Sequence, residues 1–249
     1  MTTVDLGRFE PDFDALVVGS GGIGAALAEA LAAHPRCARV FRTARRPDAA
    51  RARAQTLALD LCDDESIARF GEALADADVH PALVIVTAGV LHDSDRDLAP
   101  EKRLADLDRS NLQHSFDVNA VGPLLLARAL ASRLPRREHA VWATLSARVG
   151  SIGDNRAGGW YAYRMSKAAQ NMATRTLAIE LGRRHRGLAV VALHPGTVST
   201  PLSAPYRAAE DPGVRAPEVA AGDLLSVIDG LDASHSGRFF AWDGSELPW

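Results

Sequence analysis

Cysteine is scarce in this sequence, and the two cysteines present do not form a motif. Cys37 and Cys62 stand far apart, and neither belongs to a C-x-x-C pair. This excludes a disulfide framework and a thiolate metal site. The eight histidines show no H-x-x-x-H or similar ligand spacing. We therefore expect no bound metal, and we interpret both cysteines as structural thiols.

An excess of either charge is also missing. The 28 basic and 31 acidic residues are mixed along the chain and give a formal net charge of -3. Such a balance gives no reason to expect nucleic acid or a membrane surface as a partner. No stretch reaches the roughly 18 apolar residues of a membrane span, and the first residues lack a basic segment followed by an apolar run. We expect a cytoplasmic protein.

The sequence does contain a regular alternation of short apolar runs and helical stretches. The runs cover residues 15–19, 38–44, 56–61, 82–89, 140–146, 188–196 and 237–244, and helical periodicity covers 23–33, 109–133 and 164–184 among others. Continuous apolar runs suit strands buried on both faces, and their alternation with helices is typical of a parallel sheet. We therefore predict an α/β fold over residues 1–249: a single domain with a doubly wound Rossmann-type parallel sheet of about seven strands and helices on both faces. Residues 200–218 are interpreted as a loop or short helices over a site.

A glycine-rich turn joins the first predicted strand to the first helix. Gly19, Gly21, Gly22 and Gly24, with Ser20 and Ile23 between them, have the spacing G-x-G-x-x-G. Glycines permit a tight turn and let backbone N–H groups approach a pyrophosphate at a helix N-terminus. The turn predicts a dinucleotide site, with a glycine turn that binds nothing as the alternative.

The end of the second predicted strand indicates which dinucleotide. An NAD site would place an acidic residue here for the ribose hydroxyls, but residues 39–47 contain none. Arg45 and Arg46 instead suit a 2′-phosphate, and Thr43 is assigned to the same cofactor site. We therefore expect NADP(H) in preference to NAD(H). Otherwise Arg42, Arg45 and Arg46 are only solvated loop charges.

The segment GGWYAYRMSKAA, residues 158–169, contains two tyrosines and one lysine. On a helix, Tyr163 and Lys167 share one face about 5–6 Å apart, whereas Tyr161 faces Met165. A nearby positive charge favours the phenolate and lowers the pKa of a tyrosine. The spacing predicts an acid/base pair only if the rest of the chain supports it.

Two further motifs supply that support: DVNAVGP (117–123) and LHPGTVST (193–200). Together with the glycine turn and Y-x-x-x-K, they resemble the short-chain dehydrogenase/reductase family over essentially the whole chain. The segment SARVGSIGDNRAGGWYAYRMSKAAQN (146–171) is most similar to the branch that contains the C-factor cell-signalling proteins and the sniffer-type carbonyl reductases.

The resemblance implies roles for individual residues. Tyr163 matches the catalytic acid/base, and Lys167 matches the residue that lowers its pKa and holds the nicotinamide ribose; Tyr161 is then a wall or packing residue. Asn119 matches an asparagine that supports a water and proton path to the lysine, with relief of helix strain beside Gly122 and Pro123 as the alternative.

The resemblance also implies cofactor contacts. Asp60 and Leu61 match the adenine contact, although Asp60 could equally cap the following helix. Ala88 and Gly89 match the turn after the fourth strand, where Thr87 replaces the usual asparagine. The loop that fixes the nicotinamide corresponds to Pro195, Gly196, Val198 and Thr200.

Two departures from the family pattern stand out. The glycine loop is one residue shorter than the usual G-x-x-x-G-x-G, so pyrophosphate contacts shift. The catalytic serine is displaced: alignment puts Ser146 at the first serine of the S-S-x-x-G pattern and Ala147 at the second, catalytic one. Ser146 is the best available hydroxyl, with Ser151 or no serine as the alternatives.

The resemblance implies an NADP-dependent carbonyl reductase or alcohol dehydrogenase that acts on a small-molecule substrate. The alternative is a nucleotide-binding signalling protein of the C-factor type with little turnover. We expect a homodimer or homotetramer that forms through the helices at 109–133 and 164–184. The aromatic residues that could line a pocket or a subunit contact are Trp160, Tyr161, Tyr206, Trp242 and Trp249.

Overall fold

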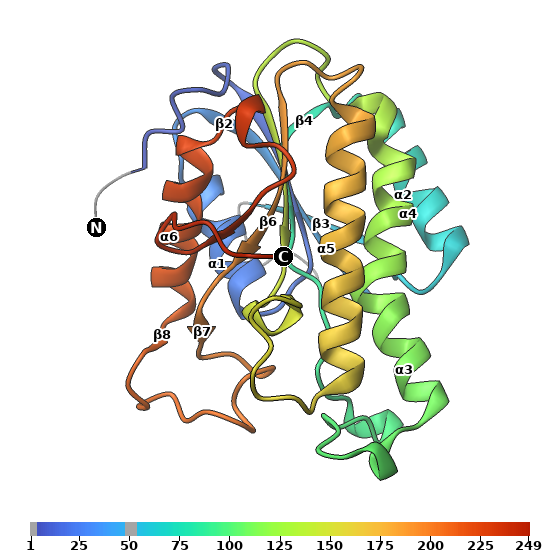
Figure 1. The fold of residues 1–249 in the computed structure, drawn as a ribbon. Coiled ribbons are helices and arrows are strands. Elements are labelled where there is room, and N and C mark those ends of the chain that lie inside the picture. Colours follow the sequence, from blue (N-terminus) through green and yellow to red (C-terminus); the bar gives the residue numbers. More distant parts are fainter. Residues whose placement is uncertain (1–3, 48–53) are drawn as a thin grey trace.

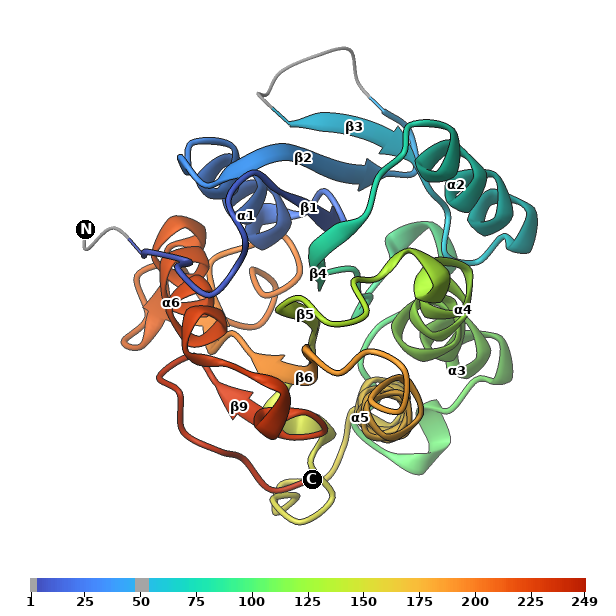
Figure 2. The same cartoon turned by 90° about the horizontal axis from the view of Figure 1, so that it is seen from above.

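The computed structural model describes residues 4–47 and 54–249. Within them, seven strands form one parallel sheet in the order β3-β2-β1-β4-β5-β6-β9 (Figures 1 and 2). They are β1 (Phe13–Val18), β2 (Cys37–Ala44), β3 (Gln55–Ala58), β4 (Pro81–Val86), β5 (Ala140–Leu145), β6 (Leu188–His194) and β9 (Phe239–Ala241). Each strand falls on an apolar run that the sequence analysis identified, so the predicted sheet is confirmed.

Helices cover both faces of this sheet (Figure 2). On one face lie α1 (Gly22–Ala32) and α6 (Pro217–Gly230), and on the other lie α2 (Asp64–Asp76), α3 (Arg109–Phe116), α4 (Gly122–Leu130) and α5 (Tyr161–Leu181). Successive strand residues serve opposite cores: Val17 joins the core under α1 and α6, and Val18 joins the core under α2, α4 and α5. This alternation explains the continuous apolar runs, because both faces of each strand are buried. The doubly wound prediction is confirmed.

The predicted helix at 109–133 is interrupted. A π-helical turn, η3 (Asp117–Val121), separates α3 from α4, and the N–H of Gly122 donates to the carbonyl of Asp117, five residues earlier. Gly122 also lies very close to Leu61, because a Cβ added at this glycine would lie 2.4 Å from the Leu61 carbonyl oxygen. Single π turns inside helices often occur at functional sites. This one contains Asn119.

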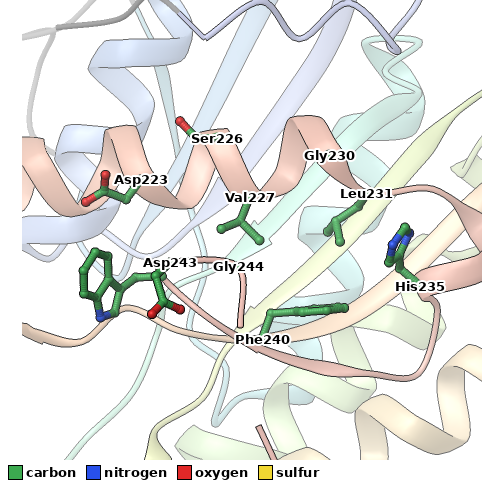
Figure 3. A pocket seen from close by; sticks show the side chains of 10 residues that line it. Asp223, Ser226, Val227, Gly230, Leu231, His235, Phe240, Asp243 and Gly244 are labelled. Carbon is green, nitrogen blue, oxygen red and sulfur yellow. The ribbon is translucent and has the colours of Figure 1, made fainter. Parts of the chain in front are cut away.

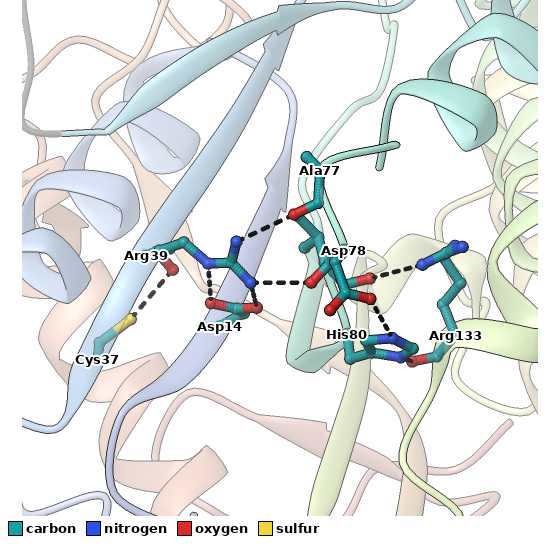
Figure 4. A network of polar contacts seen from close by, with 8 residues as sticks. Asp14, Cys37, Arg39, Ala77, Asp78, His80 and Arg133 are labelled. Atoms are coloured by element: carbon teal, nitrogen blue, oxygen red, sulfur yellow. Dashed lines mark hydrogen bonds and ion pairs between the residues drawn. The ribbon is translucent and has the colours of Figure 1, made fainter. Parts of the chain in front are cut away.

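Polar contacts connect β1, β2 and the turn before β4 near the amino ends of these strands (Figure 4). Arg39 of β2 donates to the Asp14 carboxylate of β1 with an Nε–Oδ1 distance of 2.7 Å. Its other nitrogens donate to the carbonyls of Ala77 (3.2 Å) and Asp78 (3.1 Å) in the turn before β4. The network therefore holds together the edge of the sheet opposite its carboxyl ends. In doubly wound sheets the ligand binds outside the carboxyl ends, where the strand order reverses. That point is here between β1 and β4.

The segment after β6 is irregular. A two-residue strand, β7 (Thr197–Val198), pairs in parallel with β8 (Val214–Arg215), and residues 199–213 form a loop between them. The prediction of a loop or short helices for 200–218 is right for most of this range, but α6 already begins at Pro217. None of the helices in the described ranges is long and apolar enough to cross a bilayer.

Candidate active site

The glycine turn between β1 and α1 has the geometry of a nucleotide cradle. Gly19 has a φ of +119°, and a Cβ there would lie 2.6 Å from the Thr87 hydroxyl. Gly21 precedes α1 as its N-cap, but no side chain caps the helix, so the N–H groups of the first turn face outward from the helix end. Ser20 and Gly21 are exposed. An anion is favoured at such a helix terminus.

The carboxyl end of β2 provides both support and charge. The Thr43 hydroxyl is buried and accepts a hydrogen bond from the Gly19 N–H at 3.0 Å. Thr43 therefore holds the glycine turn in place, and its contact with the cofactor stays a prediction. Arg45 and Arg46 follow β2 immediately and are exposed.

Asp60 lies beyond the end of β3 and does not cap the next helix. Its Oδ1 accepts from the Cys62 N–H at 2.9 Å, whereas the α2 cap is Asp63, which accepts from the Glu65 N–H at 2.9 Å. The capping alternative for Asp60 is thus wrong. Asp60 and Leu61 remain predicted adenine contacts.

The turn after β4 brings three predicted residues together. The N–H groups of Thr87 and Ala88 both donate to the Val18 carbonyl, which places this turn beside the glycine turn. A Cβ added to Gly89 would lie 3.3 Å from Lys167 Nζ and 3.3 Å from Asn119 Oδ1. Gly89 therefore lets both side chains approach the turn.

Asn119 is fully buried and links three elements. Its Oδ1 accepts from the Val90 N–H at 2.7 Å, and its Nδ2 donates to the Val90 carbonyl (2.9 Å) and to the Ser166 hydroxyl of α5 (2.9 Å). Ser166 in turn donates to the carbonyl of Tyr163 at 3.0 Å. The asparagine thus ties the π turn to the helix turn that carries the tyrosine.

Tyr163 and Lys167 are neighbours on α5, as their spacing predicts. Lys167 Nζ lies 5.9 Å from the centre of the Tyr163 ring. The ammonium is buried and donates to the Leu145 carbonyl at the end of β5 (2.9 Å) and to Gln170 Oε1 (2.9 Å). Two neutral acceptors therefore fix the lysine at the strand end.

The electrostatics differ from the expected lowering of the tyrosine pKa. Burial raises the pKa of Tyr163 to about 12, and burial lowers the pKa of Lys167 to about 7. Desolvation penalises the charged form of each group, so it raises the pKa of the phenol and lowers the pKa of the amine. Tyr163 is therefore held protonated, which suits a proton donor.

Ser146 lies at the end of β5, and its hydroxyl forms a hydrogen bond within the protein. The Oγ is buried and donates to Asn171 Oδ1 of α5 at 2.6 Å. A serine has one hydroxyl proton, so this bond excludes simultaneous donation to a substrate. In this geometry the hydroxyl is directed toward Asn171, and the catalytic role of Ser146 stays a prediction. Ser151 is also buried and accepts from the Asp154 N–H at 3.2 Å, whereas Ala147 is only partly buried.

The loop after β6 closes toward the glycine turn. A Cβ on Gly22 would lie 3.0 Å from the Thr200 methyl carbon, so these two predicted cofactor residues are adjacent. Gly196 has a φ of +76° and lies against Trp242. Arg215 donates to the Pro195 carbonyl at 3.1 Å and stacks 3.9 Å from the centre of a Trp242 ring.

Aromatic side chains gather beside Tyr163. The Trp160 ring lies 6.3 Å from the Tyr163 ring and 5.3 Å from the Tyr206 ring, measured between centroids. His92, from the turn after β4, lies 5.9 Å from Tyr206 and hydrogen-bonds the Pro201 carbonyl at 3.1 Å. Trp160, Tyr206 and His92 therefore form an aromatic wall that joins three loops.

A separate hollow of about 450 Å³ lies between α6 and the C-terminal segment (Figure 3). Trp242 lines it together with Val227, Leu231 and Phe240, but Tyr163 and Lys167 do not. Trp249 instead stacks on Phe239 at 5.6 Å. Neither tryptophan belongs to the aromatic wall.

Sequence reasoning missed a buried polar stripe on α5. It consists of Ser166, Gln170, Asn171 and Thr174, which lie beside the predicted Lys167. These residues recur at helical spacing, and small polar side chains at that spacing were the available signal. It also missed Glu101, which contacts the start of α5 and has no local sequence signature.

Comparison with known proteins shows the family to which this chain is similar. A model of the short chain dehydrogenase family matches residues 14–211. The C-signal protein of Myxococcus xanthus is 42% identical over 146 residues, which cover 59% of this chain and 83% of that protein. The 1-hydroxy-2-glutathionyl-2-methyl-3-butene dehydrogenase of Rhodococcus sp. (strain AD45) is 34% identical over 194 residues, or 77% and 78% of the two chains. The structure of a carbonyl reductase from Pseudomonas aeruginosa PAO1 in complex with NADP superposes with a TM-score of 0.74 at 27% identity, over 95% of this chain and 100% of that one.

Proposed function

Since this chain belongs to the short chain dehydrogenase family, we propose that it is an NADP-dependent oxidoreductase that interconverts a carbonyl compound and its alcohol. The observation that carries the proposal is the convergence of Gly89, Asn119 and Lys167 beside Tyr163. These residues come from three separate segments and meet at the carboxyl end of the sheet.

The cofactor residues fit a phosphorylated dinucleotide. The uncapped start of α1 would hold the pyrophosphate. Gly24 lets this helix pack closely against the glycine turn, because a Cβ there would lie 2.5 Å from the Gly19 carbonyl oxygen. Arg45 and Arg46 would hold the 2′-phosphate, and Asp60 would contact the adenine. When bound, NADPH supplies a hydride.

The protein residues supply and position the proton. In reduction, Tyr163 donates its phenolic proton to the substrate oxygen as negative charge develops there. The raised pKa keeps that proton in place at neutral pH. Lys167 and Asn119 hold the tyrosine-bearing turn through Leu145 and Ser166, and they line the path along which the proton is replaced. With Ser146 bound to Asn171, Tyr163 is the principal hydrogen-bond donor to the oxygen.

A signalling protein with little turnover is the second candidate. Two observations favour it: the 42% identity to C-signal and the placement of Ala147 where the family pattern has a catalytic serine. The intact pair of Tyr163 and Lys167 favours the enzyme.

Pairing of two copies through α4 and α5 is a further part of the proposal. Met165, Met172 and Ile179 of α5 are 50%, 68% and 56% exposed and recur every seven residues, so they form one apolar stripe. Leu124 of α4 is 41% exposed. Sedimentation of the parent and of Met172→Glu tests this pairing, because a charge in the stripe should yield monomers if the stripe forms the interface.

A carbonyl-substrate panel with NADPH and with NADH tests the function. Loss of absorbance at the nicotinamide band, faster with NADPH and dependent on Tyr163, is the expected result. Tight NADPH binding without turnover on any ketone or aldehyde would favour the signalling candidate.

A further inference from the structure

Glu101 contacts the first turn of α5 from a distant loop. This loop follows β4, and Glu101 lies just before the short helix η2 (Leu104–Asp106). The side chain is 4% exposed, and its Oε2 accepts from the Ala162 N–H at 3.1 Å. Its main-chain carbonyl accepts from the Trp160 N–H at 2.6 Å. The two hydrogen bonds hold Trp160 and Ala162, the residues on either side of Tyr161, where the helix begins.

Trp160 occupies the N-cap position of this helix in an unusual way. Its φ is 53° and its ψ is 45°, in the left-handed region, and it makes no side-chain cap bond. N-caps are normally Ser, Thr, Asp or Asn, whose side chains accept from the first turn. An indole has no acceptor, so the Ala162 N–H would lack a partner without Glu101. The glutamate therefore allows an aromatic ring to stand at this position.

Burial of the Glu101 carboxylate destabilises the fold, which indicates that this side chain has a functional role. The second carboxylate oxygen, Oε1, is buried and has no hydrogen-bond partner among the described residues. A buried polar atom without a partner destabilises the fold, although the positive end of the α5 dipole offsets part of the charge. A serine at position 160 would cap the helix without burying a carboxylate. It would also remove the ring that lies between Tyr163 and Tyr206.

We propose that Glu101 is a positioning residue for Tyr163 and Trp160: it fixes the start of α5, and thereby the direction of the phenol and the place of the aromatic wall. This inference rests on the proposed function, because a fixed phenol matters only if Tyr163 transfers a proton. Tyr163 is in the first turn of α5, three positions after Trp160 and directly after Ala162, so fraying of this turn moves the phenol directly. Displacement of a reacting group by about 1 Å can cost about a hundredfold in rate.

Fluorotyrosine labelling gives a readout that does not depend on a substrate. The chain has only three tyrosines, so 3-fluorotyrosine gives three ¹⁹F resonances, and Tyr163→Phe and Tyr206→Phe assign two of them. In Glu101→Ala we expect the Tyr163 and Tyr206 resonances to shift and broaden. Asp108→Ala is the matched control, because Asp108 caps α3 with a bond of 3.0 Å to the Asn111 N–H, and this variant should leave both resonances unchanged. Unchanged spectra in Glu101→Ala would overturn the proposal.

Kinetics with NADPH and isatin, a planar aromatic dicarbonyl, provide the second arm. Glu101→Ala should lower kcat by about 10- to 100-fold while the Kd for NADPH stays within about twofold, because the cofactor residues are elsewhere. Glu101→Gln keeps an acceptor oxygen of the same reach and should restore most of kcat. An equal loss of kcat in Glu101→Ala and Asp108→Ala would overturn the proposal, since it would show a general effect of lost helix caps.

Two further outcomes separate this proposal from the proposed function. If the parent reduces no carbonyl compound but Glu101→Ala alone shifts the Tyr163 resonance, Glu101 positions the phenol and the reductase function is wrong. If Glu101→Ala does not fold, Glu101→Asp replaces it, because the shorter side chain cannot reach the Ala162 N–H. Parent-like kcat and parent-like resonances in Glu101→Asp would then contradict the proposal.

Discussion

The Ser146 hydroxyl donates to the Asn171 side-chain oxygen at 2.6 Å, and Asn171 Nδ2 in turn donates to the Gly150 carbonyl at 3.4 Å. The serine at the end of β5 is thus part of a buried link between β5, α5 and the loop at Gly150. The hydroxyl faces into the protein.

Ser146→Ala should therefore weaken the fold more than it weakens catalysis. Loss of the hydroxyl leaves a buried acceptor on Asn171, which costs about 1–3 kcal/mol in the free energy of unfolding. The loss of kcat should stay well below the roughly 10²–10³-fold cost of removing one oxyanion donor. Urea denaturation and steady-state kinetics on the same preparation measure both quantities. A hundredfold loss of kcat with unchanged stability would instead support the catalytic role predicted for Ser146.

Ala147→Ser should raise turnover. Ala147 is partly buried directly after Ser146, and the sequence analysis predicts that it takes the place of the catalytic serine of the family pattern. A hydroxyl there would add a second donor to the developing negative charge on the substrate oxygen. We expect kcat to rise about threefold to tenfold, which is less than the roughly 10²–10³-fold cost of removing one such donor. Ser151→Ala, at another serine of the same loop, is the control and should leave kcat unchanged.

Titration of the cofactor-free protein should reveal the raised pKa of Tyr163. The phenolate absorbance that is present in the parent and missing in Tyr163→Phe should develop at a pH of about 12, above the ordinary tyrosine value of 10.0. The folded protein holds this proton more tightly than the unfolded chain does. The free energy of unfolding should therefore fall as the pH rises from 10.0, the ordinary tyrosine pKa, to about 12, the pKa in the folded protein. A difference in phenolate absorbance between the parent and Tyr163→Phe below pH 10 would contradict this prediction, because it would show that Lys167 lowers the pKa of Tyr163.

Cofactor preference should depend on the charge beyond β2. We expect tighter binding of NADPH than of NADH, and Arg45→Asp should narrow or reverse this difference because a carboxylate repels the 2′-phosphate and suits ribose hydroxyls. Arg183→Asp, an exposed change of the same kind near the C-terminal end of α5, is the control. Calorimetric titration with both cofactors measures the difference. Equal affinities in the parent would refute the assignment.

The fold was predictable because its signals are local. A strand buried on both faces must be apolar along its length, so all seven strands of the sheet are visible in the sequence. That Tyr163 and Lys167 lie next to each other follows from helical spacing alone. The break at η3 had its signal in Gly122 and Pro123, which disfavour a continuous helix at this point.

Other features of the site depend on contacts between distant segments. Side-chain spacing suggested that Lys167 lowers the pKa of Tyr163, but the burial that raises it is a property of the packed loops. The direction of the Ser146 hydroxyl is decided by Asn171 on another element. Glu101 and Ala162 are 61 positions apart, and no periodicity connects them.

The central claim is that Tyr163, and not its neighbour Tyr161, transfers the proton. Single-turnover reduction of isatin by NADPH, followed at the nicotinamide band for the parent, Tyr163→Phe and Tyr161→Phe, tests it most directly. We predict that Tyr163→Phe binds NADPH as the parent does but loses at least about 10²-fold in rate, at the lower bound for general acid catalysis, and that Tyr161→Phe retains most of the rate. Equal losses in the two variants, or a parent-like rate in Tyr163→Phe, would contradict the account.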